Sequence, residues 1–450
     1  MSLIRPTSEF TSRREEDESS SLGNPLHLPL GKGEEPTDSP PFQGGVRGGC
    51  RSSLSLNEAI LASSSSVRDS IPEQHRAHFE TLRQEIIDFA KAHDIPRESL
   101  TKPDALVEAA KKLSTPDLQR LALLLERFEY LLVHKEPQES TDPLEYVEKY
   151  YHLKKQYDSQ VDLLKQVGIL KEGAITGIDG NTYPIPTLEQ ITARLFEQRE
   201  TLSTKHDQGF TKLLLVPFSM SLDALVETFK QFLLSYKQKN PTFDLDTNRP
   251  LWAWEEYQGA DMGDSPKLVY HPQSFTEKDH GGKTKVQILE EQEDNQYPFP
   301  GWTIHFLQPS DPSNPDSPGF AHIPREGKGI LQGKETPRPP LEAGQSSNEY
   351  LSTIQKAQDD EDSHYHGETG LTPEDWIMAF MIHLTQTGQP IDNFQNGIES
   401  ISYLTGVFFP SHTVRVPYVY WLRSDRQVSL YYYDSSDQCE SVGVRTSVIV

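Results

Sequence analysis

Apolar residues recur with helical spacing in three stretches between about residue 72 and residue 168. The three stripes are Phe79, Leu82, Ile86 and Phe89; Leu118, Leu121, Leu125, Phe128 and Leu132; and Tyr146, Tyr150, Leu153, Tyr157 and Leu164. Steps of three and four residues are typical of amphipathic helices, whose apolar faces need partners. Thr115 followed by Pro116 supplies a helix start. The pattern predicts a small helical bundle, or a helical hairpin followed by an arm.

The pattern changes to mixed elements after residue 168. Residues 175–183 alternate around Asp179-Gly180, which is typical of a β-hairpin. Thr187 with Gln190 three residues later forms a capping box for a helix to about residue 206. The apolar run 213–218 predicts a buried strand, and Ser221 caps a following helix.

Residues 240–370 are loop-rich and broken by many prolines, with one clear strand at 302–307. So much irregular chain needs a scaffold beneath it. A helix starts at Thr372 and ends at Gly388, and four strands follow, at 401–409, 416–422, 428–433 and 442–450. The whole pattern predicts an α+β fold: a helical middle region (72–168), a hairpin and connecting helix (169–209), and a mixed α/β domain with a long irregular insert (210–450).

Residues 1–71 show neither helical nor strand periodicity and are rich in Ser, Gly, Pro and charge. Such composition predicts a disordered low-complexity segment. The stretch 28–49 resembles translated products of dispersed bacterial genomic repeats and implies no activity of its own.

Composition narrows the classes of partner. Lys+Arg 43 against Asp+Glu 67 gives a net charge of −24, the wrong sign for a protein that binds the phosphate backbone of nucleic acid. Cys50 and Cys439 are the two cysteines, which argues against a disulfide framework. We expect a cytoplasmic protein, because the chain shows no signal peptide and no apolar run long enough to span a membrane; export by a route that reads no N-terminal signal stays open.

The last 35 or so residues alternate between an apolar frame and a polar, aromatic interior. The frame is 416–423 and 442–445, and the interior is 424–441. Tyr, Ser, Asp and Arg are the residues that binding surfaces favour, because rigid rings give contact area at low entropy cost while short polar groups adapt their hydrogen bonds. The candidate ligand-binding residues are Tyr420, Arg423, Ser424, Asp425, Arg426, Ser429, Tyr431, Tyr432, Tyr433, Asp434, Ser435, Ser436, Asp437 and Ser441.

The order of elements from residue 210 onward is similar to the C-type-lectin-like fold, including its formylglycine-generating (sulfatase-modifying) branch. The local match is 420–424 followed by Gly443-Val444-Arg445 and a β-rich tail, which resembles the closing strands of that branch. The resemblance implies that Trp421 and Arg445 lie in the core. It is motif-specific only over 416–450, and the helical front resembles nothing comparable.

Within this branch the chain resembles most the variable proteins of diversity-generating retroelements, which carry a hypervariable patch at the C-terminus of such a domain. In that family adenine-directed mutation of Asn codons yields Tyr, Ser, Asp, Arg and Cys, residues that dominate 424–441. Gln427, Gln438 and Glu440 do not fit this scheme and would be fixed positions.

The sequence contains weaker signals for metal binding and for catalysis. Asp362, His364, His366 and Glu368 lie close together and suggest a divalent metal, but a solvated acidic loop explains them as well. Calcium at Asp434 and Asp437 is a further option. His383 is interpreted as a helix-surface or satisfied core histidine, and Cys439, alone in the C-terminal domain, argues against the cysteine chemistry of formylglycine-generating enzymes.

Three hypotheses of function follow. The first is a non-enzymatic protein that presents 424–441 to a protein or glycan ligand and needs no cofactor. The second is an enzyme of the formylglycine-generating-like branch with a metal- or oxygen-dependent site, and the third is a helical structural or adaptor protein. In the first, the helical region 72–168 serves docking or assembly into a homo-oligomer.

Overall fold

The computed structural model describes residues 65–93, 95–96, 113, 115–135, 142–263, 266–295, 297–412 and 414–450. Most of the segment predicted to be disordered, including the repeat-like stretch 28–49, therefore lies outside the described residues. The described end of that segment contains a short helix, Ser65–Asp69, where no element was predicted.

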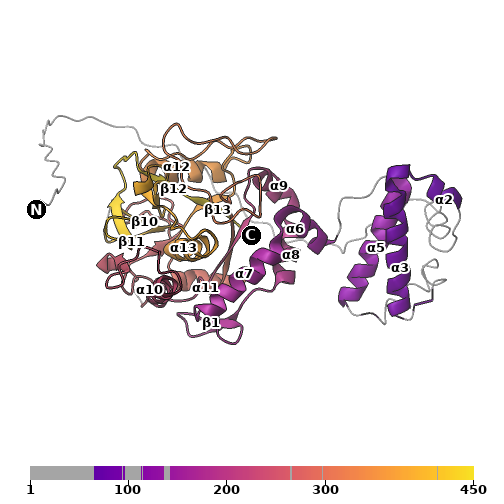
Figure 1. Cartoon of the computed structure of the whole chain (residues 1–450), viewed down its shortest axis with the longest axis horizontal. Coiled ribbons are helices and arrows are strands. Elements are labelled where there is room, and N and C mark those ends of the chain that lie inside the picture. Colours follow the sequence, from indigo (N-terminus) through magenta and orange to yellow (C-terminus); the bar gives the residue numbers. More distant parts are fainter. Residues whose placement is uncertain are drawn as a thin grey trace, which may run out of the picture. The chain divides into compact units, whose positions relative to one another are not determined.

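The described chain is a mixed α+β protein, which confirms the predicted class (Figure 1). Its α-helices are α2 (Ser65–Asp69), α3 (Arg76–Ala92), α5 (Thr115–His134), α6 (Pro143–Tyr151), α7 (Leu153–Gln166), α8 (Leu188–Glu197), α9 (Arg199–Asp207), α10 (Leu222–Lys239), α11 (Lys285–Asp294), α12 (Ser347–Gln358) and α13 (Pro373–Thr387). Short 3-10 helices are η1 (Glu73–His75), η3 (Glu255–Tyr257) and η4 (Phe394–Asn396).

The strands form two larger sheets and two small pairs. They are β1 (Ala174–Thr176), β2 (Thr182–Pro184), β3 (Lys212–Val216), β4 (Leu251–Ala253), β5 (Val269–Tyr270), β6 (Thr303–Leu307), β7 (Glu368–Gly370), β8 (Ile401–Tyr403), β9 (Val407–Phe408), β10 (Arg415–Leu422), β11 (Gln427–Asp434), β12 (Val442–Val444) and β13 (Thr446–Ile449). One sheet has the order β3-β6-β13-β7, and the other has the order β12-β8-β10-β11-β4.

The first two helical stripes pair as predicted. Helices α3 and α5 pack on each other and share a core of their own, in which Phe79 stacks on Phe128 with ring centroids 5.2 Å apart. The third stripe behaves differently, because α6 and α7 belong to the main core together with β3 and β6. The main folded body therefore begins at about residue 142, ahead of the predicted domain start at 210.

Helix α7 also covers the open edge of β3. Two buried glutamines of α7 hydrogen-bond to the β3 backbone: Gln156 accepts from Leu213 N at 2.9 Å, and Gln160 accepts from Leu215 N at 2.9 Å and donates to Leu213 O at 2.7 Å. Buried backbone groups at a sheet edge need such partners. The side-chain amides thus take the place of a neighbouring strand.

Helix α13 is the centre of the body (Figure 1). Thr372 and Asp375 form its capping box, and Gly388 closes it with φ 73°. Residues 373–382 of the helix are all buried, since it packs on α10 and β3, and its Phe380 contacts Trp421 of the five-stranded sheet. An apolar helix of this kind is typical of a core element.

Two of the four predicted closing strands are wrong in extent. The predicted strand 442–450 is two strands, because the chain leaves β8 after β12 and enters the other sheet as β13. Arg445 lies at this crossing and turns into the core. The predicted strand 401–409 likewise divides into β8 and β9.

Candidate functional site

The candidate site is built on the hairpin of β10 and β11. The two strands pair antiparallel over their full length, from Arg415 opposite Asp434 to Leu422 opposite Gln427. Strand β4 pairs parallel with β11, and β8 pairs with β10. Because successive side chains point to opposite faces of a sheet, the hairpin has two faces. One packs in the main core, and the other, which we call outward, packs in part on a second core cluster that includes Tyr350, Leu351 and Tyr403.

The inward face belongs to the main core. Val419, Trp421, Val428 and Leu430 are all buried there. Trp421 packs on Phe243, with ring centroids 5.3 Å apart. Burying such side chains removes about 1.5–3 kcal/mol each of unfavourable hydration. These inward side chains therefore anchor the hairpin to the main core.

The outward face carries an aromatic array, which we call the aromatic face. Its members are Trp252 of β4, Tyr418 and Tyr420 of β10, and Tyr431 and Tyr433 of β11. Tyr418 is buried and the other four are half-buried. The rings contact one another, with centroids 5.4 Å apart for Tyr418 and Tyr420, 5.6 Å for Tyr418 and Tyr433, and 4.8 Å for Trp252 and Tyr431.

The tyrosine hydroxyls of this face stay protonated at neutral pH. Burial raises the pKa of Tyr420, Tyr431 and Tyr433 above the ordinary value. A protonated phenol can both donate and accept a hydrogen bond. The face therefore offers flat apolar area with polar rims, which suits recognition of another surface.

Tyr432 borders the aromatic face, and the centroid of its ring lies 4.6 Å from that of Tyr431. Its ring packs on the ring of Trp254, with centroids 4.4 Å apart, and the guanidinium of Arg415 lies 4.3 Å from its centroid. The three consecutive tyrosines thus divide between the two sides of the strand, as alternation requires. Tyr432 is half-buried like Tyr431 and Tyr433, so all three stay predicted ligand contacts.

Exposed polar groups lie at both ends of β11. The turn residues Arg423, Ser424, Asp425 and Arg426 are exposed at one end. At the other end Asp434 and Ser441 are half-buried, while Ser436 and Asp437 are exposed. An eight-residue strand spans about 23 Å. The single surface predicted for 424–441 is therefore an aromatic centre between a basic turn and an acidic loop.

Two predicted ligand contacts are corrected. Ser429 is 3% exposed and Ser435 is 2% exposed, so neither side chain reaches a ligand on the folded surface. Ser429 is enclosed by strand pairing on both sides. Ser435 is held at the start of α12, where its carbonyl accepts from Asn348 N at 3.1 Å.

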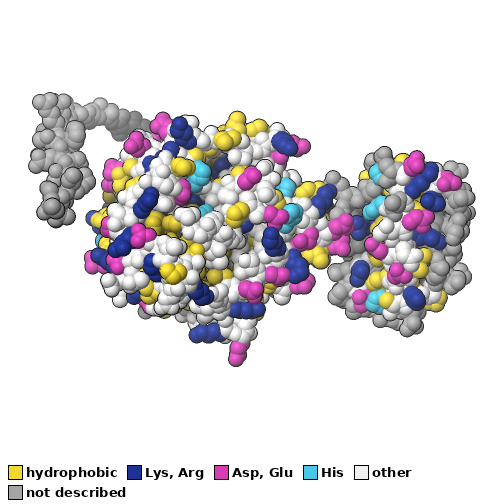
Figure 2. Space-filling view, in the orientation of Figure 1, with side chains coloured by type: hydrophobic (Ala, Val, Ile, Leu, Met, Phe, Trp, Pro, Cys, Tyr) yellow, Lys and Arg dark blue, Asp and Glu magenta, His cyan; other side chains and the backbone are white. Residues whose placement is uncertain are grey.

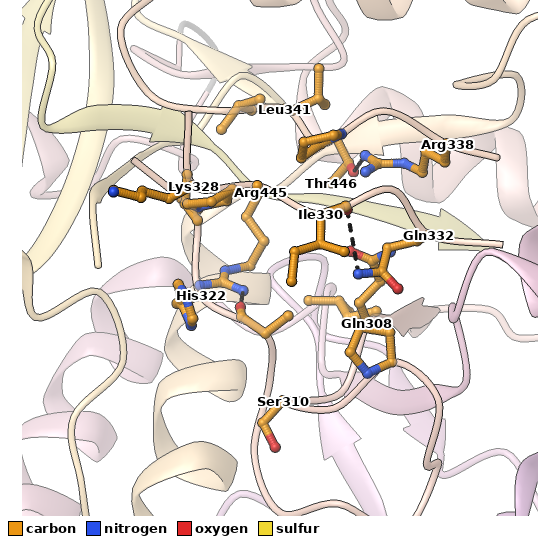
Figure 3. A pocket seen from close by; sticks show the side chains of 18 residues that line it. Gln308, Ser310, His322, Lys328, Ile330, Gln332, Arg338, Leu341, Arg445 and Thr446 are labelled. Atoms are coloured by element: carbon orange, nitrogen blue, oxygen red, sulfur yellow. Dashed lines mark hydrogen bonds between the residues drawn. The ribbon is translucent and has the colours of Figure 1, made fainter. Parts of the chain in front are cut away.

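The two residues that the resemblance assigned to the core are buried. Trp421 is 4% exposed and Arg445 is 7% exposed. Arg445 Nη2 lies 2.7 Å from Asp392 Oδ1, and the other oxygen of Asp392 accepts from the indole of Trp376 at 2.7 Å. Figure 3 shows Arg445 beside a cavity together with Arg338 and Thr446.

The residues considered for metal binding have other partners. Glu368 pairs with Lys205 and Arg338, each at 2.7 Å, and His366 Nδ1 lies 2.9 Å from the carbonyl of Ala357. Asp434 Oδ1 accepts from Ser436 N at 2.9 Å. Within the described ranges, no group of three His, Cys, Asp or Glu side chains is placed to hold a metal ion. Cys439 is a free, half-buried thiol.

His383 is a core-facing acceptor. Its Nδ1 accepts from Phe320 N at 3.0 Å, and burial, with smaller contributions from Arg445 and Lys212, lowers the pKa of His383 to about 3. An unfolded histidine titrates near 6.5. Between about pH 3 and pH 6.5, His383 is therefore protonated in the unfolded chain and neutral in the folded chain.

We therefore expect acid to destabilise the protein through His383. The free energy of unfolding should fall by about 1.4 kcal/mol per pH unit below 6.5 from this residue alone. Urea unfolding at pH 7.5 and 5.5 measures the loss. His383→Asn, which keeps an acceptor where Nδ1 lies, should lose less stability between the two pH values; an equal loss in both proteins would contradict the assignment.

Two members of the aromatic face were not among the predicted site residues. Trp252 lies in a stretch interpreted as loop. It pairs in parallel with Ser429 of β11, a residue 177 positions later in the chain. Tyr418 was predicted to belong to the apolar frame 416–423 and not to the binding surface. Only the alternation in Trp252-Ala253-Trp254 hinted at a strand.

Comparison with known proteins gives no further constraint. No protein-family model matches the chain, and no curated protein and no solved structure matches it either. Within the described ranges, no helix has the length and apolarity needed to cross a membrane. On the face shown in Figure 2, basic side chains are scattered among acidic ones.

Proposed function

We propose that this chain is a non-enzymatic ligand-binding protein that presents a diversifiable C-terminal surface on a C-type-lectin-like scaffold. The observation that carries the proposal is the contrast between the two faces of the β10-β11 hairpin. The inward side chains are fixed in the main core, whereas the outward face exposes part of each of four aromatic rings and ends in exposed turn and loop residues.

The topology supports the scaffold half of the proposal. Strand β3, near the start of the predicted domain, and β13, at the end of the described chain, lie in the same sheet, with β6 between them. Helices α10 and α13 pack on each other, and α13 packs on β3. The resemblance to the C-type-lectin-like fold rests on the order strand, helix, long irregular insert, helix and closing strands, and these elements occur in that order in the chain.

The surface chemistry supports recognition of a protein or glycan. Tyr rings lose little entropy on binding, and a supported strand holds them in place before the ligand arrives. Arg423 and Arg426 on the turn, and Asp434 and Asp437 on the loop, add charges of opposite sign at the two ends. A ligand that spans the face would meet an aromatic centre and two polar ends.

Sequencing of the DNA around the gene tests the proposal. We expect a reverse transcriptase gene and a near-copy of the segment that encodes 424–441, differing from it at adenines. The structure adds a finer expectation. The differences should fall on codons for exposed residues such as Ser424, Asp425 and Asp437, and should spare the buried Ser429 and Ser435. Related genes whose final segment varies no more than the remainder would contradict the proposal.

A further inference from the structure

A cavity of about 200 Å³ lies where the chain passes from β12 to β13. It is lined by Val444, Arg445 and Thr446, by the segment after β6 and by residues of the loop 321–341. Figure 3 shows the lining side chains. The cavity shares no residue with the aromatic face, so what binds there is independent of the function proposed above.

The charge of the lining is opposite to that of the chain. The 18 lining residues include Lys328, Arg338 and Arg445 and contain no Asp or Glu. The whole chain has 67 acidic and 43 basic residues. A lining of this sign in an acidic protein favours an anion over a cation.

The buried carboxylates behind the wall do not cancel this charge. Arg338 and Lys205 both pair with the one carboxylate of Glu368, which leaves one positive charge in excess. Arg445 is matched by Asp392 alone. Because these groups are removed from water, the excess charge is weakly screened.

The other half of the lining is apolar. Ile323, Leu341 and Val444 are buried around the cavity. Ile330 also lines it, yet its side chain is 74% exposed. Figure 3 shows Ile330 between Arg445 and Gln332. An exposed aliphatic side chain beside a cavity gives an apolar ligand a surface to cover.

The loop that carries Ile330 is held in place on both sides. Glu342 accepts from Gly327 N at 2.8 Å and Gly329 N at 2.6 Å. Asp207 accepts from Lys334 N at 2.7 Å. Ile330 is thus presented on a supported loop, and little ordering is needed when a ligand binds.

We infer that this cavity binds a small apolar carboxylate. The apolar part would lie against Ile330, Ile323 and Leu341. The carboxylate would lie toward Arg445, whose Nε is buried and has no hydrogen-bond partner among the described residues. A volume of about 200 Å³ is below the range of about 300–1,000 Å³ typical of drug-sized ligands, so the ligand is a short-chain or single-ring acid.

Calorimetric titration of the full chain with octanoate tests the inference. We expect saturable binding at millimolar octanoate or below, and affinities at least about tenfold weaker for octanol and for octylamine, because charge-assisted hydrogen bonds are about twice as strong as neutral ones. Equal affinity for the three probes, or no binding of octanoate, would overturn the inference.

Neighbouring residues supply a matched pair of variants. Ile330→Ser should weaken octanoate binding at least about fivefold, because it removes apolar contact area. Leu331→Ser should leave binding unchanged, since Leu331 is 61% exposed and does not line the cavity. Thermal unfolding of both variants checks that they fold. The same weakening in both variants would show that octanoate binds elsewhere on the loop and would overturn the assignment.

Discussion

Replacing Lys285 by methionine should lower the free energy of unfolding by about 3–5 kcal/mol, the usual result of removing one partner from a buried ion pair. Lys285 is fully buried, and its Nζ lies 2.6 Å from Asp261 and 2.7 Å from Glu374. Burial alone would lower its pKa, but Glu374 and Asp261 more than offset this and the pKa of Lys285 is raised. The variant would leave two carboxylates facing each other in the core. Urea unfolding at neutral pH measures the loss.

Lys283 provides the control for this experiment. Its Nζ lies 2.7 Å from Glu291, but both side chains are about half exposed, at 51% and 49%. An exposed pair contributes about 0–1 kcal/mol, so Lys283→Met should change stability little. If the two methionine variants lose the same free energy, the buried site does not stabilise the fold in the way described.

The second large effect is expected at Glu368. This carboxylate is fully buried on β7 and pairs with both Lys205 and Arg338. Glu368→Gln would leave two buried cations without a counter-charge. We expect a loss of about 3–5 kcal/mol in the free energy of unfolding, measured by urea unfolding at pH 7.

The dependence on pH adds a second measurement at Glu368. Burial would raise its pKa, but Arg338 and Lys205 more than offset this, and the pKa of Glu368 is lowered. Glu368 therefore stabilises the fold fully at pH values above its unfolded pKa of about 4.3. This stabilisation is lost as the pH falls through the lower pKa of the folded state. The Glu368→Gln variant should not show this part of the decrease in the free energy of unfolding at low pH. Asp158→Asn, in an exposed pair with Lys154, is the control; an equal effect at both sites would contradict the assignment.

Local signals in the sequence predicted local structure well. The capping box at Thr187, the helix start at Thr372 and the hairpin around Asp179-Gly180 are present in the structure, because such motifs act within a few residues. The alternation in the last strands also placed β10 and β11 to within one residue.

Features that depend on distant partners were not predicted. The break at Arg445 requires Asp392 to receive the guanidinium, and the place of Trp252 on the aromatic face requires parallel pairing with β11. The burial of Ser429 and Ser435 is set by neighbouring strands and by α12. A serine looks the same in sequence whether it is exposed or enclosed.

The central claim is that the exposed positions of the C-terminal hairpin and its end loops can change without disturbing the buried frame. Serine-to-tyrosine substitution at four positions tests it most directly, with the free energy of unfolding measured for each variant. Ser424→Tyr and Ser436→Tyr, both exposed, should stay within about 0.5 kcal/mol of the parent. Ser429→Tyr and Ser435→Tyr, both buried, should lose about 1–3 kcal/mol or more, because extra volume strains a packed site. Equal losses at all four positions would contradict the claim.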